Sequence, residues 1–261
     1  NHAEALRQLA AIAYATGRPE QVIAWLDRAL AIQPHAESYS LRGNAWLWIG
    51  NLPTAEQNYR QALAIEPQGA ILFSNLGNVQ RLQGMPVEAA ASCRQALKLK
   101  PDLGIAWTNL GCALLDLGDT AQARTALAKA RALCPDAADV LYHQGTAWRM
   151  EDNLEAAADS FRQAMAMAPH DLNILNDLGN CLLQLGHFEE ASGYFRECLR
   201  LDPDMDVAQD NLLYCYCFHP AITPQQYLDE ARLAGERLQA RATPCTQWPA
   251  RSLSPPPLRV G

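Results

Sequence analysis

A repeat of 34 residues dominates this sequence and restricts the folds that the chain can adopt. Two consecutive blocks, 70–103 and 104–137, carry similar residues at the same offsets. In the first block these residues are Phe73, Leu76, Gly77, Gln80, Gly84, Ala89, Cys93, Ala96 and Pro101, and in the second they are Trp107, Leu110, Gly111, Leu114, Gly118, Ala123, Leu127, Ala130 and Pro135. A fixed period of this length is typical of an elongated array of stacked units, which has no single central core.

Each block is expected to form two helices joined by a tight turn. On the first helix, positions 4, 7, 8 and 11 of the block share one side, because a helix has 3.6 residues per turn. Glycine inside a helix costs about 1 kcal/mol relative to alanine, so Gly77 and Gly111 at position 8 indicate that a second helix approaches the backbone there. We expect the small alanines at positions 20 and 27 of the second helix to make this approach. Glycine at position 15 and proline at position 32 predict where the two helices end.

The same register extends on both sides of these blocks. It predicts six repeats in all, at residues 3–35, 36–69, 70–103, 104–137, 138–171 and 172–205. In the fifth repeat, Asp152 and Asn153 stand where the other repeats have glycine, so we expect turn-forming residues other than glycine to make this turn. Six repeats exceed the roughly three that are needed to bury a continuous core.

The pattern of a bulky residue, Leu-Gly and a second bulky residue, followed by spaced alanines and a proline, resembles the tetratricopeptide repeat. This resemblance implies an all-α fold, a right-handed α-solenoid superhelix of helical hairpins with C-terminal capping helices. Residues 206–241 are expected to form these closing or junction helices, because Asp206–Phe218 restarts a first helix in which Leu212-Leu213 replaces Leu-Gly. After a break at His219-Pro220, Thr223-Pro224 predicts the start of another helix that packs back on the closing helix.

Charge and composition argue against several classes of function. The net charge of −7 and the lack of a basic stripe argue against nucleic acid as the main partner. The eight cysteines show neither disulfide nor zinc-ligand spacing, which favours reduced, structural thiols in a cytoplasmic protein. No apolar run approaches the roughly 18 residues of a membrane span, so no membrane partner is expected. We recognise no phosphate-binding loop, metal-ligand set or nucleophile arrangement, and therefore assign no catalytic residue, metal or cofactor to this chain.

The concave face of a tetratricopeptide superhelix is formed by the first helices, and it is the predicted binding surface. Positions 2, 5, 6, 9, 12 and 13 line it. The side-chain amide of asparagine offers one acceptor and two donor hydrogens, which match the peptide bonds of an extended ligand. At position 6 we predict ligand contact by Asn75, Asn109 and Asn211, with Asp177 at the same position of another repeat. At position 9, Asn44, Asn78 and Asn180 either contact the ligand or form hydrogen bonds between helices.

Larger side chains are further candidates for this groove. Trp48 at position 13, like Tyr14 at position 12, is not needed for packing, so it either stacks on a partner side chain or contacts the next repeat. Arg81 and Arg149 could select charged ligands, and the alternative is that they belong to a solvated face.

A second resemblance concerns the C-terminal part of the chain. The segments Asn211-Leu212-Leu213-Tyr214, Phe218-His219-Pro220, Ala234-Gly235-Glu236-Arg237 and Pro257-Leu258-Arg259-Val260-Gly261 are similar to the junction in bacterial O-linked N-acetylglucosamine transferase-like proteins, of the glycosyltransferase family forty-one type. In that family the repeats lead into a two-lobed glycosyltransferase. The resemblance implies UDP-N-acetylglucosamine as donor, serine or threonine as acceptor, and position-6 asparagines that hold the backbone of protein substrates. This chain departs from that ladder at Gln8, Leu41, His143 and Asp177.

Residues 242–261 are expected to form a proline-rich linker followed by the truncated start of such a catalytic domain. The chain also lacks an initiating methionine, and we therefore expect a fragment whose catalytic residues lie beyond Gly261. One predicted function is the substrate-selecting arm of a transferase, which binds extended peptide segments of protein substrates. The alternative is a non-enzymatic adaptor or self-assembly scaffold, including a homodimer formed through the convex face. A transferase that acts on a non-protein acceptor is a third possibility.

Overall fold

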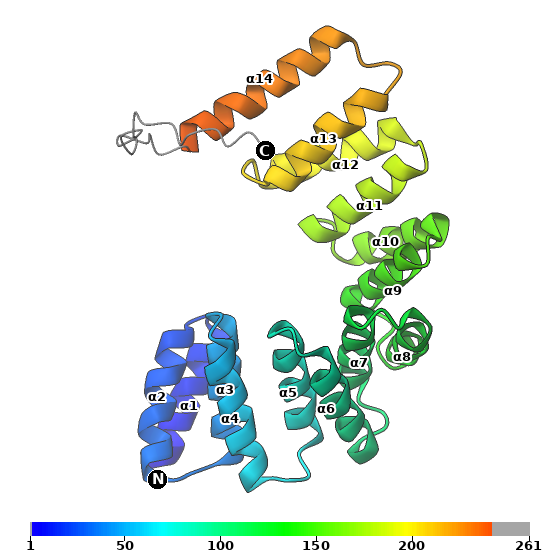
Figure 1. Cartoon of the computed structure of the whole chain (residues 1–261). Coiled ribbons are helices and arrows are strands. Elements are labelled where there is room, and N and C mark those ends of the chain that lie inside the picture. The colour runs from blue at the N-terminus through cyan, green and yellow to red at the C-terminus, as the bar shows by residue number, and fades with distance from the viewer. Residues whose placement is uncertain (1, 242–261) are drawn as a thin grey trace, which may run out of the picture.

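The computed structural model describes residues 2–241, and every regular element among them is an α-helix. The helices are α1 (His2–Ala15), α2 (Pro19–Ile32), α3 (Ala36–Trp48), α4 (Leu52–Ile65), α5 (Ala70–Leu82), α6 (Pro86–Leu99), α7 (Gly104–Asp116), α8 (Thr120–Leu133), α9 (Ala138–Met150), α10 (Leu154–Met167), α11 (Leu172–Gln184), α12 (Phe188–Leu201), α13 (Asp206–Phe218) and α14 (Pro224–Arg241). Successive helices pair as hairpins, from α1–α2 to α11–α12, and each hairpin packs on the next. The hairpins follow a curved path, with α1 and α14 near its two ends (Figure 1). This arrangement confirms the predicted all-α solenoid.

The turn inside each hairpin combines the end of one helix with the start of the next. At Gly50 the backbone is left-handed, with a φ of 81°, and the N–H of Asn51 donates to the carbonyl of Trp46 at 2.9 Å. The side chain of Asn51 then accepts a hydrogen bond from the N–H of Thr54 at 3.2 Å and caps α4. Asp152 adopts the same left-handed conformation, with a φ of 59°. This confirms that the fifth turn is made without glycine.

Glycine at position 8 of the first helix lies against the second helix, as predicted, and the side chain at position 24 of the second helix is nearest to it. A Cβ atom on Gly145 would lie 2.6 Å from Cε1 of Phe161, and one on Gly111 would lie 2.6 Å from Cγ of Leu127. The side chain at position 24 therefore makes the closest contact, and at Gly77 the backbone oxygen of Ala89 at position 20 also lies within 3.0 Å. The alanines at positions 20 and 27, such as Ala123, are fully buried beside it. Their small size lets the two helices approach, and the larger side chain then covers the glycine.

The last two helices close the array. Helix α14 packs on α13 as predicted, and its contacts include polar ones: Arg237 donates to Oε1 of Gln209 at 2.6 Å, and Arg241 donates to Asp206. Ala234 is the one residue of α14 that is buried. The predicted linker and strand at residues 242–261 lie outside the described residues. Between residues 2 and 241, no helix combines the length and the apolar character that a membrane span requires.

Candidate functional site

The inner side of the arc is formed by the first helices of the repeats. Neighbouring first helices contact each other in the pairs α1–α3, α5–α7, α7–α9 and α11–α13, and no two second helices in the described part of the chain pack comparably. A stack curves toward the side on which its elements are more closely spaced, so the first helices lie on the concave side (Figure 1). The predicted groove residues belong to α3, α5, α7, α9, α11 and α13.

Two of the position-6 asparagines connect neighbouring repeats. Asn109 in α7 donates its side-chain N–H groups to the carbonyl and the hydroxyl oxygen of Ser74 in α5, at 3.2 and 3.1 Å. Asn211 in α13 donates to Oδ1 of Asn176 in α11 at 2.9 Å. In both cases the amide nitrogen donates a hydrogen bond to the preceding repeat. The amide oxygen accepts no hydrogen bond from any residue that the structure describes. A peptide in the groove would therefore meet these residues as hydrogen-bond acceptors.

Asp177, at the same position in α11, forms a polar cluster with α9. Its carboxylate accepts a hydrogen bond from the hydroxyl of Tyr142 at 3.0 Å and lies 3.7 Å from Nη2 of Arg149. Burial raises the pKa of Tyr142 to about 12, and the negative charge of Asp177 acts in the same direction. Tyr142 is therefore a neutral donor at physiological pH, and Arg149 is an ion-paired side chain.

Arg81 makes a similar connection between α5 and α7. Its Nη1 lies 3.4 Å from Oδ2 of Asp116. Burial lowers the pKa of nearby His143, and the positive charge of Arg81 lowers it further. Burial also raises the pKa of the Cys112 thiol to about 12. Both Arg81 and Arg149 keep a buried Nε that has no hydrogen-bond partner among residues 2–241.

The other asparagines of the groove differ from one another. Oδ1 of Asn44 accepts a hydrogen bond from the hydroxyl of Tyr59 at 2.6 Å. Of the two alternatives for Asn44, ligand contact or a hydrogen bond between helices, the structure contains the second. The half-buried side chains of Asn75, Asn78 and Asn180 form no hydrogen bond within the described part of the chain. Their donor hydrogens and acceptor oxygens remain available to a ligand.

Trp48 combines the two roles that the sequence left open. Its ring packs edge-on against Tyr14 of the preceding repeat, with ring centroids 5.7 Å apart and an interplanar angle of 84°. Nevertheless, 54% of Trp48 is exposed. The indole therefore joins the first two repeats and still presents an aromatic surface to a partner.

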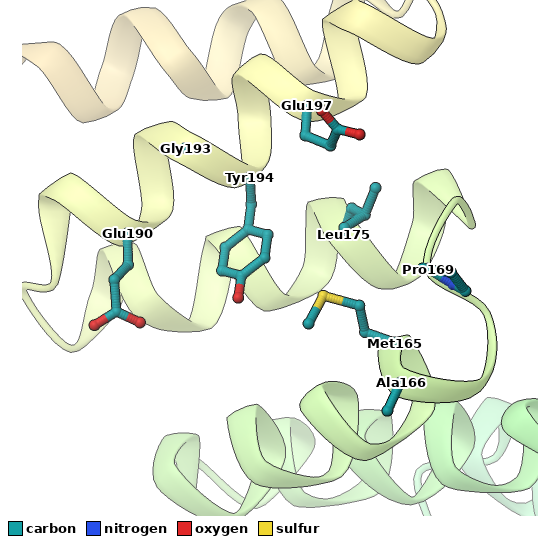
Figure 2. Close-up of a pocket in the computed structure, with 8 residues that line it drawn as sticks. All are labelled: Met165, Ala166, Pro169, Leu175, Glu190, Gly193, Tyr194 and Glu197. Atoms are coloured by element: carbon teal, nitrogen blue, oxygen red, sulfur yellow. The ribbon is translucent and has the colours of Figure 1, made fainter.

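An apolar hollow of about 520 Å³ lies between α10, α11 and α12, where the sequence predicted no site. Met165 and Tyr194 point into it from the two second helices, with Leu175 behind them (Figure 2). A Cβ atom on Gly193 would meet nothing within 4 Å, so this glycine leaves open space beside Tyr194. A glycine on the outer face of a helix is the one sequence signal that could have indicated this hollow.

The part of the chain that the structure describes contains neither a cluster of metal-ligating side chains nor a disulfide. No group of three or more His, Cys, Asp or Glu side chains within residues 2–241 could hold a metal ion. The seven cysteines of this segment are all unpaired, and Cys93, Cys112, Cys181, Cys198 and Cys215 are buried. For these residues, the predicted structural role of the thiols is consistent with their packing.

Family models match most of the described chain. Models described as tetratricopeptide repeat match residues 42–103 and 108–171, residues 149–213, and residues 3–28. They describe the repeats and carry no information on a glycosyltransferase. None of the curated proteins matches this chain.

Several solved structures are similar to most of the array. In the anaphase-promoting complex hetero-tetramer Cut9-Hcn1, the matched chain is 16% identical with a TM-score of 0.77, and the match covers 82% of this chain but 42% of that one. The type IV pilus biogenesis factor PilW is 22% identical with a TM-score of 0.72, over 80% of this chain and 98% of PilW. YrrB, described as a TPR protein with an unusual peptide-binding site, is 21% identical with a TM-score of 0.52, over 71% of this chain and 96% of YrrB. At these identities the likeness concerns the fold alone.

Proposed function

Because this chain belongs to the tetratricopeptide repeat family, we propose that it is a protein-binding scaffold whose concave groove holds extended segments of partner proteins. The observation that carries this proposal is a group of three groove amides, Asn75, Asn78 and Asn109, which we call the amide patch. Asn75 and Asn78 are three residues apart in α5 and so share one face of that helix. Asn109 lies beside them, because it bonds to Ser74 in the same helix.

The amide patch suits a peptide backbone rather than a particular side chain. Asn75 and Asn78 offer donors and acceptors that no described residue uses, and Asn109 offers its acceptor oxygen. An extended peptide presents an N–H donor and a C=O acceptor at almost every residue, so the two sets are complementary. YrrB, which has a similar structure, is described as having an unusual peptide-binding site, and this supports peptide binding as a use of the fold.

Binding of fluorescently labelled random 12-residue peptides, measured by anisotropy, tests the proposal. Replacement of Asn75 and Asn109 by alanine removes hydrogen bonds that contribute about 1 kcal/mol each, so we expect affinity to fall about tenfold or more. The matched control replaces the exposed outer-face amides Gln21 and Gln57 by alanine, and its affinity should equal that of the wild-type protein. Equal affinity of the groove variant and this control would contradict the proposal.

The finer proposal is that the scaffold is the substrate-selecting arm of a glycosyltransferase. It rests on the junction residues, which resemble those of O-linked N-acetylglucosamine transferase-like proteins, and within which His219 is buried and accepts a hydrogen bond from the N–H of Ala221 at 3.2 Å. In this proposal UDP-N-acetylglucosamine is the donor, and the residues that transfer the sugar to serine or threonine lie beyond Gly261. A groove that holds a substrate would raise the local concentration of its hydroxyl groups at the attached active site.

Intact-mass spectrometry of acceptor proteins tests this finer proposal. The chain is extended beyond Gly261 and incubated with UDP-N-acetylglucosamine and candidate proteins. A mass increase of one N-acetylhexosamine on serine or threonine is expected, and the Asn75 and Asn109 alanine variant should lose transfer while it retains sugar-nucleotide binding. Loss of both activities together would refute the role assigned to the groove.

A non-enzymatic adaptor that self-associates through its outer face is the second candidate. The apolar hollow around Tyr194 favours it, because an open apolar surface between two second helices can take a side chain of a neighbouring molecule (Figure 2). Analytical ultracentrifugation of the wild-type protein and of Tyr194→Glu checks this candidate. A dimer that the substitution dissociates would support it, and a monomer at all concentrations would exclude it.

A further inference from the structure

A small polar pocket lies between the first two repeats, on the groove side of the array. Its volume is about 250 Å³, and it is lined from α1 and α3 by positions 2, 5, 6 and 9 of the repeat, which are occupied here by Glu37, Arg7, Gln8, Leu41 and Ala11. Leu26 of α2 contributes an apolar wall, and His35 comes from the loop that precedes α3. The pocket therefore belongs to the same face as the amide patch.

Three polar atoms of this pocket are buried without a hydrogen-bond partner. They are Nη1 of Arg7, Nδ1 of His35 and Oγ of Ser38, and each belongs to a residue that lines the pocket. Ser38 is only 2% exposed, so its hydroxyl has little contact with bulk solvent. The described chain contains six such side-chain atoms, and half of them gather in this pocket. Buried polar groups are almost always paired in native proteins, so this concentration indicates a site that is completed by a ligand.

The charges around the pocket favour a neutral ligand over an anionic one. Nε and Nη2 of Arg7 both donate to Oε2 of Glu4, at 2.9 and 2.5 Å, so the guanidinium charge is already balanced. Glu37 is a second carboxylate at the rim. A further negative charge would be repelled by two carboxylates and attracted by one paired guanidinium, whereas a neutral group meets no such repulsion.

We infer that this pocket binds the side-chain amide of a glutamine in the bound peptide, an inference that rests on the proposed peptide-binding function. The amide oxygen has two lone pairs and can accept from Nη1 of Arg7 and from the Ser38 hydroxyl. The amide nitrogen can donate to Nδ1 of His35 when the ring hydrogen is on Nε2. Leu26 and Leu41 line the same pocket and can contact the two methylene groups of the glutamine. Such a ligand satisfies all three atoms without adding charge.

Nuclear magnetic resonance with capped amino acids tests the inference directly. The probe is N-acetyl-L-glutamine N-methylamide, compared with the glutamate and methionine analogues, which keep the size but change the charge or remove the hydrogen bonds. We expect saturable shifts of backbone amides around residues 7 and 38 with the glutamine probe, and at least about fivefold weaker binding of the other two. Equal responses to all three probes, or shifts confined to other repeats, would overturn the inference.

Variants of two buried serines provide the structural control. Ser38→Ala removes a hydroxyl that has no partner, so the variant should keep its thermal midpoint while its affinity for the glutamine probe falls about fivefold. Ser160→Ala should leave that affinity unchanged, because the hydroxyl of Ser160 donates a hydrogen bond to the carbonyl of Ala156 within its own helix. If Ser38→Ala binds the glutamine probe as the wild-type protein does, the assignment of the pocket is wrong.

The same experiments separate this inference from the proposed function. Shifts with the glutamine probe in a chain that binds no 12-residue peptide would leave the pocket in place and refute peptide binding. Peptide binding with no preference for glutamine would refute the pocket and leave the function intact. In the Asn75 and Asn109 alanine variant, we expect peptide binding to weaken while the shifts caused by the glutamine probe persist.

Discussion

Replacement of Gly145 by alanine tests the close approach of the two helices in a hairpin. In α9 a Cβ atom at this position would lie 2.6, 2.7 and 2.9 Å from three ring atoms of Phe161. The ring is fully buried, with an exposed fraction of 0%, so it cannot swing aside into solvent. Either the ring or one of the helices must move, and the packing of both would suffer.

The size of the effect follows from two opposing contributions. Alanine favours the helical backbone by about 1 kcal/mol relative to glycine. Overpacking of a well-packed core costs about 1–3 kcal/mol, and three contacts shorter than 3.0 Å place Gly145→Ala in the upper part of that range. We therefore expect a net destabilisation of about 1–2 kcal/mol, which lowers the thermal midpoint by about 2–8 °C in a chain of this size.

Gly193→Ala is the matched control, because it makes the same substitution inside α12 in a place where the new Cβ meets no atom within 4 Å. It should raise the midpoint by about 2–4 °C. Thermal and urea unfolding, followed by circular dichroism, measure both variants under the same conditions, since a repeat array need not unfold in one step. An increase of the midpoint in Gly145→Ala that equals that of Gly193→Ala would refute the argument.

Three further predictions concern single side chains. Asp152→Gly should raise the thermal midpoint by about 2–4 °C, because glycine adopts the left-handed backbone at this turn without the steric cost of a Cβ. Folding raises the pKa of Tyr142 to about 12 from its ordinary value near 10, so the contribution of Tyr142 to the free energy of unfolding is complete below pH 10 and is lost as the pH rises toward 12. Urea unfolding should therefore show that Tyr142→Phe loses less stability over that pH interval than the wild-type protein does. Iodoacetamide at pH 8 should modify the exposed Cys134 and Cys217 quickly and spare Cys112, whose thiol has a pKa of about 12, as peptide mass spectrometry can determine.

The helices and their turns follow from rules that act over a few residues, and for this reason they could be predicted. Glycine at position 15 predicts a left-handed helix end, as Gly50 shows, and Asp152 takes the same conformation because a short polar side chain tolerates it. Proline at position 32 stops the second helix. The approach of the second helix beside its small alanines was predicted, but the side chain at position 24 that covers the position-8 glycine was not. Which side chain covers it depends on the distance between two helices, and that distance is not encoded in either helix alone.

The resemblance to the tetratricopeptide repeat predicted which residues line the groove, but not which of their donor and acceptor atoms are free to bind a ligand. Asn109 stands at the expected position, yet its amide nitrogen bonds to Ser74, and the Tyr142 hydroxyl likewise bonds to Asp177. Each of these bonds joins residues that are 35 positions apart, and it exists only because the stacked repeats bring the two first helices into contact. The pocket at Ser38 arises in the same way, between side chains of two repeats and a loop.

The sequence by itself determined the repeat, the helix ends and the face of each helix that packs, because periodicity and turn chemistry are local properties. The face that lines the concave side was expected from the resemblance to the tetratricopeptide repeat. Only the tertiary structure decided which polar atoms of that face are used within the array and which remain for a partner. The physical reason is that a hydrogen bond requires its two atoms to come within about 3 Å of each other, and the spacing between stacked repeats results from the packing of many buried side chains together.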